Sequence, residues 1–145
     1  MQHFPHTYRV QGDAQASGVN VRLCADKLPD LETAPPAEFG GPGDKWSPES
    51  LLVAAIADCF ILSFKAIARG SRFEWQNIHC DVSGILDQVE KVTCFTHIDI
   101  EAVLYIEDEG KQAMGERLLH KAEQSCLITN SLTATVTLKT DVRVI

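Results

Sequence analysis

Residues 47–70 read SPESLLVAAIADCFILSFKAIARG, and this stretch decides how the rest of the chain must fold. Ser47 can cap the first free amide groups of a helix, Pro48 suits the first helical position, and Gly70 can close the end. Apolar side chains occupy nearly every side of this helix. We therefore expect one long helix that is buried in the centre of the protein.

A membrane span is the competing interpretation of such a helix. It requires about 18 or more uninterrupted apolar residues, whereas Asp58, Ser63 and Lys65 interrupt this run. Burying each large apolar side chain contributes roughly 1.5–3 kcal/mol, so this helix is the largest source of folding free energy in the chain. The sequence favours the core helix of a soluble protein.

Composition narrows the class of protein further. The 145 residues match one ordinary domain, so we expect residues 1–145 to form a single domain. A net charge of −7 offers no positive surface for nucleic acid or anionic membranes. Residues 1–10 lack the pattern of a secretory signal, which predicts a cytoplasmic protein. In that reducing compartment, five cysteines without a CxxC pair favour redox or nucleophilic chemistry over structural disulfides or a closed zinc site.

The segments before the central helix are short or irregular. Residues 7–10 and 19–23 are β-prone runs joined by the turn-rich GDAQASG, which predicts an N-terminal hairpin. Residues 26–46 contain four prolines and three glycines, which predicts a loop without regular elements.

The segments after the central helix show clear periodicity. Residues 75–86, 92–106 and 134–144 predict strands, and residues 107–126 predict an amphipathic helix with acids at its start. One face of the second strand is predicted to carry Cys94, Thr96, Ile98, Ile100, Ala102, Leu104 and Ile106. This order predicts an α+β fold in which antiparallel sheets wrap around the long buried central helix. Because one sheet face cannot cover a helix that is apolar on all sides, we expect a second copy to complete an intertwined, obligate homodimer.

Two cysteines on the predicted helices are the candidate reactive residues. Cys59 lies in the middle of the central helix, and Cys126 lies at the end of the second helix. A cysteine on an apolar helix is ordinarily a small hydrophobic residue, so position alone leaves both interpretations open. Cys24, Cys80 and Cys94 lie on strand patterns, and we expect them to be core residues.

Three other polar residues require an explanation. His79 and His97 lie on neighbouring predicted strands and could bind a metal, but solvent-facing histidines on a hairpin are commoner. We therefore predict neither a metal nor a cofactor. Asp58, beside Cys59, needs a partner unless it points away from the core.

Four segments occur in a specific order along the chain. They are the loop EFGGPG (residues 38–43), the helix start SPESLL (47–52), AAIADCF (54–60), and AEQSC followed by ITN (122–130). In this combination the chain resembles the OsmC/Ohr family of thiol-dependent peroxidases. The Pro-Glu pair ten residues before a helical cysteine, with a second cysteine in the last helix, is fairly specific.

The resemblance implies an intertwined homodimer that reduces organic hydroperoxides to alcohols at two interfacial active sites. Cys59 would take the role of the attacking thiolate, Cys126 that of the resolving thiol, and Glu49 that of an acidic residue that orients an arginine. In such a cycle, the peroxide oxidises one thiol to a sulfenic acid, and the second thiol closes a disulfide. A dithiol reductant, often a lipoyl group in this family, then restores both thiols.

The position of Glu49 argues for a contribution from a second copy. Ten residues of helix place Glu49 roughly 15 Å along the axis from Cys59, so it should not touch the thiol of its own chain. If two central helices run antiparallel, Glu49 of a second copy becomes a neighbour. Apart from the resemblance, Glu49 is equally explained as a helix-start carboxylate that interacts with the helix dipole.

The chain departs from Ohr-type members at one position. These members carry an arginine in the first hairpin loop, and residues 12–18 contain none. A thiolate in apolar surroundings needs a stabilising neighbour. Arg9 and Arg22 are the nearest candidates, and we assign neither to the site. The departure favours an OsmC-like member over a typical Ohr.

The leading functional interpretation is an organic hydroperoxide peroxidase that protects against oxidative stress. Ile56, Phe60 and their copies in a second chain would supply apolar walls that favour organic peroxides over hydrogen peroxide. One alternative is an OsmC-like ligand-binding dimer that lacks the redox cycle. Another is a hot-dog-type thioesterase, in which an antiparallel sheet also wraps around a long helix.

Overall fold

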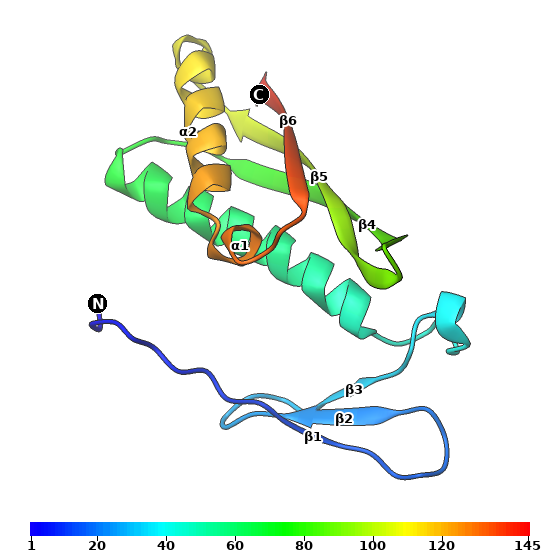
Figure 1. Ribbon diagram of the computed structural model, residues 1–145. Coiled ribbons are helices and arrows are strands. Elements are labelled where there is room, and N and C mark those ends of the chain that lie inside the picture. Colours follow the sequence, from blue (N-terminus) through cyan, green and yellow to red (C-terminus); the bar gives the residue numbers. More distant parts are fainter. The chain divides into compact units, whose positions relative to one another are not determined.

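The computed structural model describes residues 1–145 and contains two compact units (Figure 1). The N-terminal unit is Met1–Leu52, and the C-terminal unit is Val53–Ile145. Their boundary falls near the start of helix α1 (Pro48–Gly70). Helix α1 therefore begins in one unit and belongs for most of its length to the other.

The N-terminal unit is built on a three-stranded antiparallel sheet. Its strands are β1 (Gln11–Asp13), β2 (Val21–Cys24) and β3 (Leu31–Thr33), in that spatial order. A short 3-10 helix, η1 (Ala37–Phe39), follows before α1. A parallel bridge joins Thr33 to Trp46, and the Ala34 amide donates to the Trp46 carbonyl oxygen at 3.0 Å.

Two sequence predictions for this unit are wrong. Residues 7–10 form no strand, because pairing with β2 begins only at Gln11, opposite Cys24. Residues 26–46 are not wholly irregular, since they contain β3 and η1. Prolines and glycines flank both short elements, which limits their length without preventing them.

Helix α1 begins where the sequence predicts. Ser47 Oγ accepts a hydrogen bond from the Ser50 amide at 3.1 Å, and Ser50 Oγ accepts one from the Ser47 amide at 2.8 Å. These reciprocal bonds satisfy two amide groups, one at the helix N-terminus and one immediately before it, as in a capping box. The predicted role of Ser47 as the cap is confirmed.

Burial of α1 is limited to one stripe. The side chains of Ile56, Phe60, Phe64 and Ala68, spaced four residues apart, are all 0% exposed. Leu62, between two of them in sequence, is 56% exposed. A single chain therefore buries less of this helix than the sequence predicts and leaves an apolar face uncovered.

The C-terminal unit contains a sheet in the order β4-β5-β6 with α1 and α2 packed on one face (Figure 1). Its elements after α1 are β4 (Asn77–Val89), β5 (Val92–Ile106), η2 (Glu109–Lys111), α2 (Gln112–Ser125), α3 (Leu127–Asn130) and β6 (Thr135–Val144). Strands β4 and β5 form an antiparallel hairpin. Strands β5 and β6 are parallel, because the chain crosses back through α2, and this pair departs from the antiparallel prediction.

A β-bulge in the hairpin changes which side chains face the core. The register shifts so that Leu86 pairs with Phe95, and Thr96 becomes an extra residue on β5. The simple alternation placed Cys94 and Thr96 on the same face as Ile98. That prediction is wrong beyond the bulge, where Phe95 packs against the core instead.

The hydrophobic core lies between the sheet and the two helices. From β5 and α2 it contains Ile98, Ile100, Ala102, Leu104, Ile106, Leu118, Leu119 and Ala122, next to the buried stripe of α1. The predicted inner face of β5 is confirmed from Ile98 onward. The predicted α+β class, with two sheets and a long central helix, is also confirmed.

By length and composition alone, α1 could cross a membrane, and 22% of its most apolar window is buried. Asp58, Ser63 and Lys65 interrupt the apolar run, but they do not exclude a membrane span by this criterion, contrary to the argument from the sequence. The same test is also passed by core helices of soluble proteins, and the stripe of α1 packs against the sheet as such a helix does.

Candidate active site

Cys59 and Cys126 are neighbours in the C-terminal unit, although they lie far apart in the sequence. Cys59 is half-buried on α1, and Cys126 is 0% exposed at the junction of α2 and α3. Burial raises the pKa of Cys126, and the adjacent Cys59 thiol raises it further. The fold therefore brings together two of the three residues that the sequence singles out.

Thr129 organises the surroundings of Cys126. Its Oγ1 donates to the Cys126 carbonyl oxygen at 3.1 Å, and Asn130 Nδ2 donates to the Gln124 carbonyl oxygen at 3.1 Å. Burial is the main influence that raises the pKa of Cys126, and the hydroxyl and amide of Thr129 oppose it. Because burial prevails, Cys126 is a protonated thiol at neutral pH.

Cys59 has a second polar neighbour on its own helix. Ser63 Oγ lies 4.0 Å from the Cys59 sulfur, one helical turn further along α1. Asp58, which precedes Cys59, is exposed and points away from the core. The sequence analysis required Asp58 either to have a partner or to point away from the core, and the structure meets the second condition.

A third thiol lies near the pair. Cys80 is on the inner face of β4, opposite Ala102 of β5, and packs against the core as predicted. Burial raises the pKa of Cys80 to about 11, with smaller contributions from Asp81 and Cys126. The half-buried Cys24 and Cys94 lie outside the core cluster, contrary to expectation.

Glu49 lies in the N-terminal unit, in the first turn of α1. Its Oε1 is completely buried and has no hydrogen-bond partner. The side chain lines a cavity of about 450 Å³ whose other walls are mostly apolar, among them Val21, Leu23, Pro35 and Phe39. A buried carboxylate oxygen without a partner is costly, so this cavity is suited to an incoming hydrogen-bond donor.

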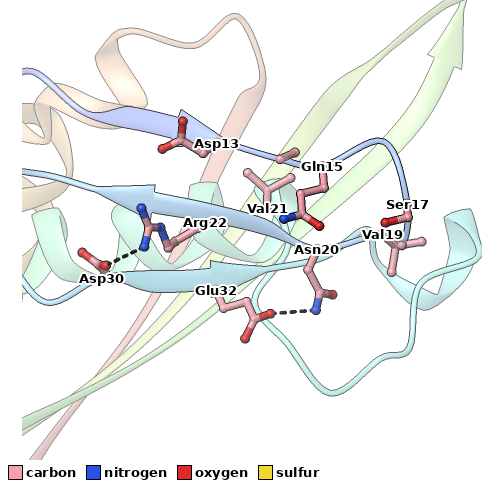
Figure 2. Close-up of a pocket in the computed structure, with 11 residues that line it drawn as sticks. Asp13, Gln15, Ser17, Val19, Asn20, Val21, Arg22, Asp30 and Glu32 are labelled. Carbon is pink, nitrogen blue, oxygen red and sulfur yellow. Dashed lines mark hydrogen bonds and ion pairs between the residues drawn. The ribbon is translucent and has the colours of Figure 1, made fainter.

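The first hairpin supplies no free arginine. A cavity of about 780 Å³ lies beside β2 and is lined mostly by polar residues. In Figure 2 the Arg22 side chain in this cavity points toward Asp30. Their closest nitrogen and oxygen atoms lie 3.7 Å apart, and Asn20 donates to Glu32 at 2.7 Å in the same cavity. Arg22 is thus paired with an acid on an exposed surface.

The two histidines of the hairpin are not paired with each other. His79 lies opposite Val103, and His97 lies opposite Ile85. Both are solvent-exposed, as the commoner interpretation predicts. No group of three or more histidine, cysteine, aspartate or glutamate side chains is arranged to hold a metal ion.

The predicted apolar walls are wrong. Ile56 and Phe60 are 0% exposed and belong to the hydrophobic core. Both residues belong to the stripe of α1 that faces the sheet. This stripe packs against the apolar inner face of β5, which the alternation of that strand defines. An apolar substrate would have to contact other side chains.

Sequence reasoning missed the two hydroxyl neighbours of the thiols, Ser63 and Thr129. The spacing of Ser63 from Cys59, four residues on a helix, places both on one side and could have indicated the contact. Thr129 gave a weaker signal, because its contact with Cys126 depends on the break between α2 and α3.

The fold and the two neighbouring thiols define a class of thiol-bearing α+β proteins. Comparisons with known proteins identify the family. Residues 41–141 match the family model described as OsmC-like protein. The chain belongs to the OsmC-like family, and its solved structural neighbours include organic hydroperoxide resistance proteins.

Individual relatives agree with this assignment. The uncharacterized protein YmaD of Bacillus subtilis is 27% identical over 112 residues, which cover 75% of each chain. An OsmC-like protein of unknown function from Vibrio cholerae has a TM-score of 0.84 at 18% identity, covering 94% of this chain and 99% of that one. An organic hydroperoxide resistance protein OsmC from Legionella pneumophila has a TM-score of 0.76 at 24% identity, covering 98% and 100%. At these identities, the solved structures establish the fold.

Proposed function

We propose that this protein is a thiol-dependent peroxidase that reduces organic hydroperoxides to alcohols, with Cys59 and Cys126 as its redox pair. The observation that carries the proposal is the proximity of these two thiols in the folded chain. Membership of the OsmC-like family supports it, because structural neighbours are named organic hydroperoxide resistance proteins.

The proposed cycle assigns different work to the two cysteines. The Cys59 thiolate attacks the terminal peroxide oxygen, a sulfur–oxygen bond forms, the oxygen–oxygen bond breaks, and the alcohol leaves after taking up a proton. The sulfur of Cys126 then displaces water from the Cys59 sulfenic acid to form a disulfide. A dithiol reductant, for which a lipoyl group is the candidate, reduces the disulfide to two thiols and is itself oxidised. The protonated state of Cys126 suits a group that acts second.

Glu49 is proposed to complete the site in an intertwined homodimer. Its buried Oε1 lacks a partner among the residues around it, which suits a hydrogen-bond donor from a second copy. The uncovered apolar face of α1 supports the same assembly, since a second copy would cover it. We further propose that residues 1–145 act as one soluble, cytoplasmic domain.

The test is consumption of cumene hydroperoxide with dihydrolipoamide as the reductant. Cys59→Ser should lower turnover by at least about a hundredfold, because it removes the nucleophile. Cys126→Ser should still reduce roughly one equivalent of peroxide and then stop with a trapped sulfenic acid. Cys94→Ser, the same substitution outside the pair, should match the wild type. Equal turnover in all four proteins would overturn the proposal.

A ligand-binding dimer is the second candidate function. The apolar cavity beside Glu49 and the absence of an arginine in the first hairpin loop favour it. This candidate predicts saturable binding of an apolar amine or alcohol, reduced by Glu49→Gln, in a protein whose Cys59 does not react with peroxide.

A further inference from the structure

Ser63 is placed where it can act on Cys59. Serine hydroxyls inside helices commonly bond to the carbonyl oxygen four residues earlier, and that residue here is Cys59. The Ser63 hydroxyl instead has the Cys59 sulfur as its hydrogen-bond partner, at 4.0 Å, the outer limit for a bond to sulfur. The half-buried position of both residues keeps this contact partly shielded from water.

The surroundings of Cys59 provide few other groups that could stabilise a negative sulfur. The buried thiol of Cys126, on the α2–α3 junction, can donate to the Cys59 sulfur, but an S–H group is a weaker hydrogen-bond donor than a hydroxyl. The carboxylate of Asp58 is exposed to solvent. No arginine or lysine side chain donates a hydrogen bond to the Cys59 sulfur. A hydroxyl donor therefore matters more here than in a site that contains a cation.

We infer that Ser63 is a positioning residue whose hydroxyl donates a hydrogen bond to the Cys59 sulfur and stabilises the thiolate that attacks the peroxide. The inference rests on the proposed function for its role in catalysis, although the contact itself does not. In the neutral pair either atom can donate. A thiolate has no proton, so the hydroxyl must donate, and the bond favours the ionised sulfur. No proton leaves Ser63. After attack the negative charge passes to the departing alkoxide, and the hydrogen bond weakens.

The experiment compares full-length wild type, Ser63→Ala and Ser63→Thr. The rate of Cys59 alkylation by iodoacetamide is measured by peptide mass spectrometry, and cumene hydroperoxide reduction is measured beside it. Ser63→Ala should slow alkylation by about tenfold, as expected for one hydrogen bond to a charged group. Ser63→Thr should restore most of the rate, because threonine retains the hydroxyl. Ser83→Ala, which removes an exposed serine hydroxyl from β4, is the matched control and should alkylate like the wild type.

The two readouts separate this inference from the proposed function. If the wild type reduces no peroxide but Ser63→Ala still slows alkylation, the peroxidase proposal fails and the role of Ser63 stands. If Ser63→Ala alkylates at the wild-type rate, the inference is overturned whatever the peroxidase result. If Ser63→Thr is as slow as Ser63→Ala, the hydroxyl is not responsible and the inference is also overturned.

Discussion

The two units of the chain differ in how much of their own surface they bury. In the C-terminal unit, long strands and two helices enclose a continuous core in which Ile98, Leu104 and Leu119 are 0% exposed. In the N-terminal unit, strands of three or four residues bury little beyond Thr33, Ala34 and Ser47. The packing within the C-terminal unit is sufficient to explain its stability, whereas the packing within the N-terminal unit is not.

This difference indicates where the protein needs an external surface. A unit of about 50 residues with so small a core is only marginally stable unless another surface packs against it. The N-terminal unit also holds the apolar cavity and the unpartnered oxygen of Glu49. The homodimer proposed above would cover this unit and give the Glu49 oxygen a hydrogen-bond partner.

The largest expected effect is the loss of a core side chain from the C-terminal unit. Phe64→Ala should lower the free energy of unfolding by about 3–5 kcal/mol. Phe64 is 0% exposed, and its ring meets Trp75 edge to face with centroids 5.4 Å apart. Leu23→Ala, which enlarges an already open cavity of the N-terminal unit, should cost less than about 1 kcal/mol. Equal losses in urea unfolding would contradict the contrast between the units.

A charge on the uncovered face of α1 should act on assembly. Leu62→Glu places a carboxylate where a second copy is proposed to pack, at a cost of about 3 kcal/mol, or roughly a hundredfold in the dissociation constant. Sedimentation should show a dimer for the wild type and a monomer for the variant. Val92→Glu, at a position 62% exposed at the start of β5, is the control and should remain dimeric. A monomeric wild type would argue against the dimer itself.

The fold was predictable wherever a periodic pattern ran long enough. Residues Ile98 to Ile106 alternate over most of a strand, and the inner face they predict is the one observed. Near Thr96 the same reasoning failed, because a bulge adds a residue that no simple alternation reveals. The strands of the N-terminal unit are too short for any period to be visible, so their ends were misplaced.

The candidate site was predictable only in part. Cys59 and Cys126 could be singled out because their motifs resemble those of a known family. Their contacts with Ser63 and Thr129 depend on rotamers and on a helix break, which composition does not reveal. The prediction that Phe60 lines a substrate pocket was wrong. A helix that is apolar on every side does not reveal which of its faces the sheet will cover.

A substitution at Gly41 should have a smaller effect and should show whether the two units unfold independently. A Cβ at Gly41 would lie 1.7 Å from the Pro35 carbonyl oxygen, so Gly41→Ala must displace backbone, at about 1–3 kcal/mol. Limited proteolysis should then cut residues 26–46 sooner, while the urea transition of the C-terminal core stays in place. Gly12→Ala is the matched control in the same unit, since its Cβ would meet Leu23 at an ordinary 3.5 Å. A shift of the core transition in Gly41→Ala would show that the units unfold together.

The smallest expected effect is a dependence of stability on pH in the C-terminal unit. Burial raises the pKa of Cys80 from 9.0 to about 11, so between these values the folded thiol keeps a proton that the unfolded thiol has lost. The unfolded state then binds fewer protons, and stability must fall as the pH rises through this window. Because the thiol is only half-buried, solvent screening reduces the contribution to roughly 1 kcal/mol. Cys80→Val removes the titrating group at similar volume, so its urea midpoint should fall less than that of the wild type over the same window. Parallel curves for the two proteins would mean that Cys80 is more solvated than its place on the inner face of β4 implies.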